Sequence, residues 1–283
     1  MKRRGLTVIA LAVASALALS GCSGAFSRGL LPHGVTDQSN LITSMWRGSW
    51  IAALGVGVLV WGLIFWCVVA YRRAKNDVGL PVQLQYNVPI EILYTVVPLL
   101  MIAVLFFYTA RDTTAVLDTS KKPDLTVNVV GKQWSWDFNY IDAGTFESGT
   151  QAELTGQPGV AATLPALYLP VNKRVEFVLT ARDVIHSFWV PQFLMKMDIL
   201  PGKVNKFQIV PTEIGTFQGK CAELCGTYHS QMLFQVKVVS QADYDAHMAA
   251  LRAQGNLGML DNSLSRAKIE PGDQQYVPKS GGN

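Results

Sequence analysis

The pattern of hydrophobic positions divides the chain into an apolar first part and a longer mixed part. Residues 48–71 form a run of 24 residues without a charge, about 36 Å long as a helix and enough to cross a hydrocarbon core of roughly 30 Å. Residues 92–110 form a second uncharged run of 19 residues. Pro98 lies within it, and we expect a kink there that packing between membrane helices can tolerate. The pattern predicts a hairpin of two transmembrane helices, over 48–71 and 92–110.

The first 21 residues have the three parts of an export signal. Basic residues at 2–4 precede an apolar stretch over 6–19, and small residues follow it. The run LSGC at 19–22 resembles the lipobox of bacterial lipoproteins, which implies cleavage before Cys22 and a lipid on its sulfur. The alternative is a plain peptidase site or an uncleaved signal, with Cys22 left free.

Charges between the two apolar runs predict the orientation. Arg72, Arg73 and Lys75 lie in this loop, and the positive-inside rule places such a loop in the cytoplasm. The N-terminus and everything after Arg111 then face outward. We therefore expect a multi-pass protein of the bacterial cell membrane, in which 22–120 is an N-terminal segment and anchor and both termini lie on the outer face.

A different pattern, of short alternating segments separated by proline and glycine, occupies 121–240. The expected strands are 125–130, 134–140, 174–180, 204–210 and 233–239. Their spacing is typical of a β-sandwich. Residues 142–165 indicate a long surface loop. Within the last part, 241–283, we expect a helix over 241–254 and a mobile polar tail from Pro271 onward.

Composition agrees with a membrane protein and excludes one class of partner. Hydrophobic residues make up 49% of the chain and charged residues only 16%. The formal charge of +4 comes from 24 basic and 20 acidic residues; without the three basic residues at 2–4 it falls to +1. A nearly neutral protein offers no electrostatic basis for binding nucleic acid.

The candidate chemistry lies in the run CAELCGTYHSQM at 221–232. It places the thiols of Cys221 and Cys225, the imidazole of His229 and the thioether of Met232 within 12 residues. Thiolates and thioethers are soft ligands that suit cuprous copper, and imidazole also binds copper. The two cysteines could instead form a disulfide or hold zinc, but a disulfide explains neither His229 nor Met232. A second thiolate, beyond the single one of a blue-copper site, favours a bridged pair of metal ions.

The whole run resembles the copper-A motif of cytochrome c oxidase subunit II. The segment DVIHSFWVP at 183–191 matches a second motif of that family. The resemblance implies an all-β cupredoxin-like Greek-key sandwich carrying two copper ions, both bridged by the cysteines. It implies these copper ligands: His186, Cys221, the carbonyl of Glu223, Cys225, His229 and Met232. It also implies that the Glu223 side chain reaches a magnesium ion shared with subunit I.

Two further residues match the family. The run QWSW at 133–136 resembles an aromatic cluster in which Trp134 would accept electrons from cytochrome c; the alternative is that these rings cover the core. Glu91 resembles a glutamate at the entrance of a proton pathway, or it is a carboxylate favoured by the helix N-terminus. The scattered acids Asp142, Glu147, Glu153 and Asp183 could face cytochrome c or be solvated. His33 and His247 are expected at the surface, and Cys67 in membrane packing.

The resemblance implies one subunit of a respiratory enzyme, inactive alone. Electrons from a soluble or tethered cytochrome c would pass through copper A to the haem-copper site of subunit I. There oxygen is reduced to water with proton translocation. Haem would lie only in the partner, and subunits I and III and membrane lipid would be the other partners. A quinol oxidase subunit would lack the copper ligands, nitrous oxide reductase would need a propeller domain, and a copper-delivery lipoprotein would need no Trp134 or Glu91.

Overall fold

The computed structural model describes residues 23–72, 79, 83, 85–152, 163–264 and 274–278. The predicted signal, Cys22, the loop residues Arg73 and Lys75, and Glu153 lie outside these residues. The chain divides into two compact units, one of Met1–Leu30 with Leu41–Val116 and the other of Leu31–Asn40 with Leu117–Asn283. We describe each unit by itself.

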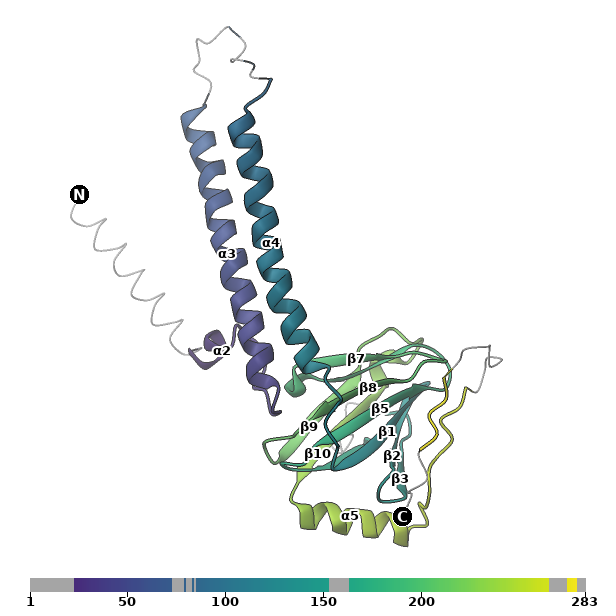
Figure 1. Cartoon of the computed structure of the whole chain (residues 1–283). Helices are drawn as coiled ribbons and strands as arrows, with labels where there is room; N and C mark the ends of the chain where they lie inside the picture. The colour runs from purple at the N-terminus through teal and green to yellow at the C-terminus, as the bar shows by residue number, and fades with distance from the viewer. Residues whose placement is uncertain are drawn as a thin grey trace, which may run out of the picture. The chain divides into compact units, whose positions relative to one another are not determined.

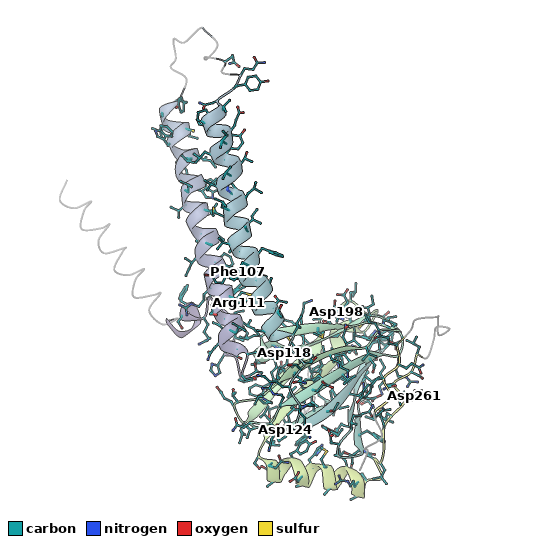
Figure 2. The ribbon with its side chains drawn as sticks, viewed as in Figure 1. Phe107, Arg111, Asp118, Asp124, Asp198 and Asp261 are labelled. Atoms are coloured by element: carbon teal, nitrogen blue, oxygen red, sulfur yellow. The ribbon has the colours of Figure 1, made fainter. Side chains whose placement is uncertain are left out.

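The first unit is dominated by two long apolar helices, α3 (Ser39–Ala70) and α4 (Val88–Val116), preceded by the short α2 (Ser23–Ser27) (Figure 1). Each long helix has a mean hydropathy of 2.4 in its most apolar window, and that window is not buried within the structure. Large side chains such as Phe107 project outward (Figure 2). Helix α4 continues through Pro98. Both helices are therefore long and apolar enough to cross a membrane.

The second unit is a sandwich of two five-stranded sheets. The first sheet has the order β3 (Thr145–Ser148), β2 (Ser135–Tyr140), β1 (Leu125–Lys132), β5 (Val175–Ala181), β8 (Asn205–Ile209). The second has the order β4 (Ala166–Pro170), β10 (Leu233–Val239), β9 (Gly215–Cys221), β6 (His186–Val190), β7 (Met195–Ile199). Strands β1 and β5 pair in parallel, as do β4 and β10, and the other pairs are antiparallel. The chain changes sheets five times, after β3, β4, β5, β7 and β8, and such crossings between the two layers are typical of Greek-key sandwiches.

Aromatic rings fill the space between the sheets. The ring of Phe188 on β6 lies 5.0 Å from that of Phe234 on β10 and 5.6 Å from that of Phe177 on β5, measured between centroids. Gly219 on β9 makes room for this stack, because a Cβ there would lie 2.1 Å from the Phe234 ring. Close packing of large rings across the two layers stabilises the sandwich.

The sequence predicted the five strands β1, β2, β5, β8 and β10 but missed the other five. The prediction of a surface loop over 142–165 was wrong at β3, which pairs with β2. The helix after the sandwich is α5 (Gln241–Ala253), and it begins where the Ser240 side chain accepts a hydrogen bond from the Asp243 N–H. In the tail, the Gln274 N–H donates to the carbonyl of Gly202 at 2.7 Å, and the mobility of the tail stays a prediction.

Candidate metal centre

The loop between β9 and β10 gathers the predicted ligands at one end of the second sheet. Cys221 is the last residue of β9, and its N–H donates to the carbonyl of Met232 at 3.0 Å, which closes the loop. Strand β6 lies alongside β9, with Phe188 opposite Cys221. His186 precedes Phe188 by two residues and so lies on the same face of the sheet.

Four donor groups surround the two cysteine sulfur atoms. The Sγ atoms of Cys221 and Cys225 are 3.9 Å apart. The Cys221 sulfur lies 3.9 Å from His186 Nδ1 and 3.1 Å from the carbonyl oxygen of Glu223. The Cys225 sulfur lies 3.5 Å from His229 Nδ1 and 3.7 Å from Met232 Sδ. The structure therefore brings together all six residues that the sequence predicted as ligands.

The centre is buried and its thiols are free. His186 and Met232 are fully enclosed, and both cysteines are buried. The ligand atoms of His186, Cys221 and Cys225 all lie within 4.8 Å of one another, close enough to hold a metal ion. A disulfide needs a sulfur–sulfur distance near 2.05 Å, so the 3.9 Å separation is that of two unbonded thiols.

The two thiols differ in their acidity. Burial opposes ionisation of Cys221, but its interactions with the His186 side chain and with backbone groups outweigh it, and the pKa of this thiol is lowered. Burial, reinforced by the charge of Cys221, raises the pKa of Cys225 to about 12. The surroundings therefore favour ionisation of Cys221 over that of Cys225. A bound cation would supply the charge that keeps both as thiolates.

The His186 ring is held in one orientation. Its Nε2 lies 2.8 Å from Asp183 Oδ1, so this nitrogen carries the proton and Nδ1 turns a lone pair toward the sulfurs. Burial opposes protonation of the ring, but Asp183 and Cys221 outweigh it and raise the pKa of His186. Gly131 on β1 leaves space for the ring, because a Cβ there would lie 2.9 Å from His186 Cδ2.

Comparison with known proteins assigns the chain to a family. Residues 125–239 match the family described as cytochrome c oxidase subunit II, periplasmic domain. The probable cytochrome c oxidase subunit 2 of Streptomyces avermitilis is 46% identical, over 95% of this chain and 93% of its own length. This chain belongs to the cytochrome c oxidase subunit 2 family. The resemblance noted in the sequence is confirmed, and so is the fold class of two apolar helices with a cupredoxin-like sandwich.

A second relative agrees with the assignment. The cytochrome c oxidase subunit 2 of Mycobacterium tuberculosis is 38% identical, over 87% of this chain and 82% of its own length. The crystal structure of the periplasmic domain of subunit II of cytochrome oxidase from Bradyrhizobium japonicum is 32% identical, covering 47% of this chain and 97% of that one, with a TM-score of 0.42. Subunit 2 is a component of the haem-copper oxidase complex, and its family normally binds copper.

Trp134 of this subunit 2 lies directly beside the metal centre. Its indole Nε1 donates to the carbonyl of Cys225 at 3.2 Å, and its ring meets that of Tyr228 edge-on at 4.9 Å. Gly226 permits this approach, because its φ is +125° and a Cβ would lie 3.1 Å from the indole ring. Trp136, by contrast, is fully buried and covers the core. The two tryptophans of the run QWSW thus have different environments.

Some predicted residues of subunit 2 are placed differently from expectation. Asp183 is not a surface acid, since its side chain is only 7% exposed. His247 is half-buried, stacked on Tyr168 at 3.6 Å, and pairs with Glu147 at 3.3 Å. His33 is exposed beside Glu213, as expected. Burial of Asp183 and His247 follows from strands that the sequence analysis missed.

Glu91 belongs to the helical unit and lies in the first turn of α4. Its carboxylate accepts a hydrogen bond from the N–H of Asn87 at 2.9 Å. This contact agrees with the second interpretation of Glu91 given above, a carboxylate favoured at a helix N-terminus. A proton-conducting role remains a prediction.

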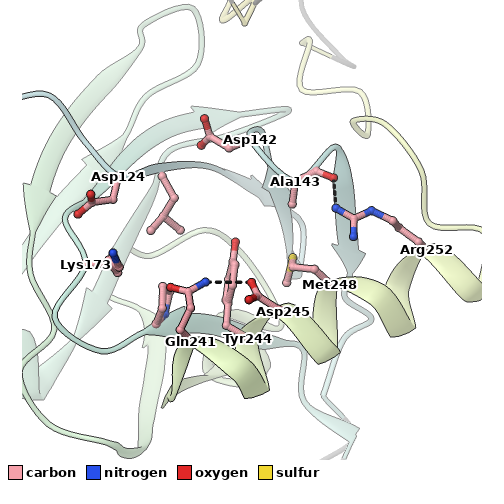
Figure 3. Close-up of a pocket in the computed structure, with 11 residues that line it drawn as sticks. Asp124, Asp142, Ala143, Lys173, Gln241, Tyr244, Asp245, Met248 and Arg252 are labelled. Atoms are coloured by element: carbon pink, nitrogen blue, oxygen red, sulfur yellow. Dashed lines mark hydrogen bonds between the residues drawn. The ribbon is translucent and has the colours of Figure 1, made fainter.

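A separate cavity of about 550 Å³ lies against α5. Its lining includes Asp124, Asp142, Lys173, Tyr244, Met248 and Arg252 (Figure 3). Met232 lies just before β10, whereas α5 begins just after this strand. None of the six donors lines the cavity. The cavity is therefore separate from the buried sulfur cluster.

Sequence analysis missed two residues that shape the metal centre, Gln133 and Gly131. Gln133 Nε2 donates to the Cys225 carbonyl at 2.8 Å. It is the first residue of the run QWSW, but nothing in the sequence indicated that its side chain would reach the loop. Gly131 ends a strand pattern, where a glycine indicates a close approach.

Proposed function

We propose that this chain carries the copper-A centre of its oxidase, accepts electrons from cytochrome c and passes them to the haem-copper site of subunit I. One observation carries the proposal. Two thiol sulfurs 3.9 Å apart are flanked by imidazole, thioether and carbonyl donors from both sides. When bound, the copper pair supplies a one-electron carrier.

The donor set fits two copper ions better than one zinc ion. The thioether of Met232 is a soft donor from which zinc gains little, whereas cuprous copper binds it well. His229 Nδ1 lies outside the group of three ligand atoms that are mutually within 4.8 Å. The donors therefore extend beyond a single three-ligand group, and the two sulfurs could each bind two metal ions, so the cluster can accommodate a pair of ions. The ligands we propose are His186, Cys221, the Glu223 carbonyl, Cys225, His229 and Met232.

The chain's own residues set the conditions for rapid transfer. Burial excludes water from the sulfurs, and the closed loop between β9 and β10 leaves the donors little freedom to move. We assign to Trp134 the role of receiving electrons, because its indole contacts the carbonyl of the ligand Cys225. Glu91 at the start of α4 is the proposed proton-pathway residue, and the Glu223 side chain the proposed magnesium ligand shared with subunit I.

The proposed organisation places this chemistry outside the bacterial cell membrane. Residues 1–21 would be removed, Cys22 would be lipidated, and 22–120 would anchor the chain through α3 and α4. The copper domain would occupy 121–240, and 241–283 would add α5 and the tail. Both termini would face outward. Subunits I and III, cytochrome c and lipid are the proposed partners, with oxygen reduction and proton translocation in the complex.

Metal analysis and electron paramagnetic resonance on the full chain test the proposal. We expect two coppers per chain and a single unpaired electron shared between them. Cys221→Ser should abolish this signal and cytochrome c oxidation in the assembled oxidase, while Cys67→Ser, a change outside the sandwich, should leave both intact. One copper with an isolated-ion spectrum, or zinc, would refute the proposal.

A further inference from the structure

We propose that Gln133 and Asp183 act as a brace that positions the Trp134 indole against the metal loop. Both are positioning residues, since they act through Trp134 and Cys225. The inference rests on the proposed function and names the residues that would set the rate at which electrons arrive. It follows from hydrogen bonds that converge on one carbonyl and one carboxylate.

The carbonyl is that of Cys225. It accepts one hydrogen bond from Gln133 Nε2 at 2.8 Å and a second from Trp134 Nε1 at 3.2 Å. A carbonyl oxygen has two lone pairs and can satisfy both donors. The turn between β1 and β2 is thus fastened to the metal loop by two adjacent side chains, and the Gln133 bond is the shorter.

The carboxylate is that of Asp183. Its Oδ2 accepts a hydrogen bond from the Gln133 backbone N–H at 2.7 Å, while its Oδ1 lies 2.8 Å from His186 Nε2. The Val184 N–H also donates to Oδ1, at 2.7 Å. A buried carboxylate with several such charge-assisted bonds is held firmly. Asp183 therefore connects the backbone before Trp134 to a proposed ligand.

Packing leaves one orientation for the Gln133 amide. If the amide were reversed, Oε1 would face the Cys225 carbonyl and two acceptors would meet. In the present orientation Oε1 is buried and has no hydrogen-bond partner among the described residues. An unsatisfied buried acceptor lowers the stability of the folded chain. A Cβ on Gly226 would lie 3.1 Å from Gln133 Nε2. The glycine therefore allows the turn and the loop to touch.

Without the brace the indole would keep its 3.2 Å hydrogen bond, the edge contact with Tyr228 and its packing against the core. Trp134 is only partly buried, so it would gain freedom to move away from Cys225. A misplacement of about 1 Å in a reacting geometry can lower a rate by roughly 100-fold. We expect loss of the brace to slow electron arrival without removing the metal.

Gln133→Met in the assembled oxidase tests this directly, because methionine keeps the length of the side chain and removes the N–H donor. The transient rate of electron transfer from reduced cytochrome c should fall by about tenfold or more, within the roughly 100-fold range of a misplaced group. The KM for cytochrome c, the copper content, the paramagnetic signal and the later transfer to haem should not change. Gln241→Met, at an exposed glutamine of α5, is the matched control and should alter none of these.

Asp183→Asn weakens both ends of the brace. It removes the negative charge that strengthens the hydrogen bonds to the Gln133 N–H and to His186, so both the transfer rate and the paramagnetic signal should change. Hydrogen exchange on the full chain gives a readout independent of activity, in which the Gln133 amide should exchange faster in this variant.

An unchanged transfer rate in Gln133→Met would overturn the proposal, and so would an altered metal signal in that variant. If Gln133→Met does not fold, Gln133→Glu gives the same comparison, since its carboxylate repels the Cys225 carbonyl. Absence of the two-copper signal from the unmodified chain would refute the proposed function itself. Failure of the proposed function can therefore be distinguished from failure of the proposed brace.

Discussion

The imidazole of His186 presents Nδ1 to the sulfur of Cys221 at 3.9 Å, while its other nitrogen is hydrogen-bonded to Asp183. A buried imidazole with one nitrogen satisfied by a carboxylate has a single tautomer, and its free nitrogen is a more basic ligand. The local sequence DVIH provides this arrangement, because Asp183 stands three residues before His186.

Removing the Asp183 carboxylate should weaken metal binding. Asp183→Ala leaves His186 Nε2 without its partner, and loss of such a partner typically costs 10- to 100-fold in metal affinity. Competition with a copper chelator on the full chain measures the change. Asp198→Ala, at an exposed acid of β7 (Figure 2), is the control and should bind copper as the unmodified chain does. Equal affinities in the two variants would contradict the assignment.

Adding a single methyl group behind His186 should displace its ring. In Gly131→Ala the new Cβ would lie 2.9 Å from His186 Cδ2, and overpacking of this kind costs about 1–3 kcal/mol. We expect a lower free energy of unfolding and weaker copper binding. Gly57→Ala places its Cβ in open space and should change neither quantity. A Gly131→Ala chain that binds copper normally would show that the ring can relax.

The aromatic core should determine the stability of the sandwich. Phe188→Ala removes a fully enclosed ring that packs on Phe234 and Phe177, and such a change costs about 3–5 kcal/mol. Denaturant unfolding of the full chain in detergent measures it. Ile214→Ala, at an exposed position, should remain within about 0.5 kcal/mol of the original. A small effect of Phe188→Ala would mean that neighbouring side chains move in to fill the space left by the ring.

The sequence could indicate that most of the proposed metal donors lie close together because these residues are local. Five of the six residues lie within 221–232, and a short loop between paired strands keeps them close together. His186 could be placed only through the family resemblance, since its approach depends on β6 lying beside β9. That pairing is long-range and leaves no periodic signal.

The missed strands share a physical cause. Strand β7 has the sequence MKMDI and β9 has GTFQGKC, with charged and glycine residues that propensity disfavours. Their neighbours in the sheet and the core beneath them stabilise them nevertheless. The contact between Gln133 and Cys225 was equally out of reach, because 92 residues separate its partners. Such contacts depend on the completed sandwich.

Alkaline pH should destabilise the sandwich through Tyr140. Burial raises the pKa of this phenol well above 10.0, and its oxygen accepts a hydrogen bond from the Tyr168 N–H at 2.9 Å. The neutral phenol is favoured in the folded chain, whereas the unfolded chain ionises near pH 10. Its contribution to stability is therefore complete below about pH 10 and falls above it by roughly 1.4 kcal/mol per pH unit.

Comparison of Tyr140→Phe with the original chain isolates this effect from that of other tyrosines. At pH 8 the variant should be less stable by about 0.5–1.5 kcal/mol, the worth of a hydrogen bond. Above about pH 10 the difference should shrink and then reverse, because phenylalanine cannot ionise in the unfolded chain. Denaturant unfolding at a series of pH values measures the gap. Tyr86→Phe, 75% exposed, should show no gap at any pH, and a constant gap for Tyr140→Phe would mean that its phenol ionises without unfolding.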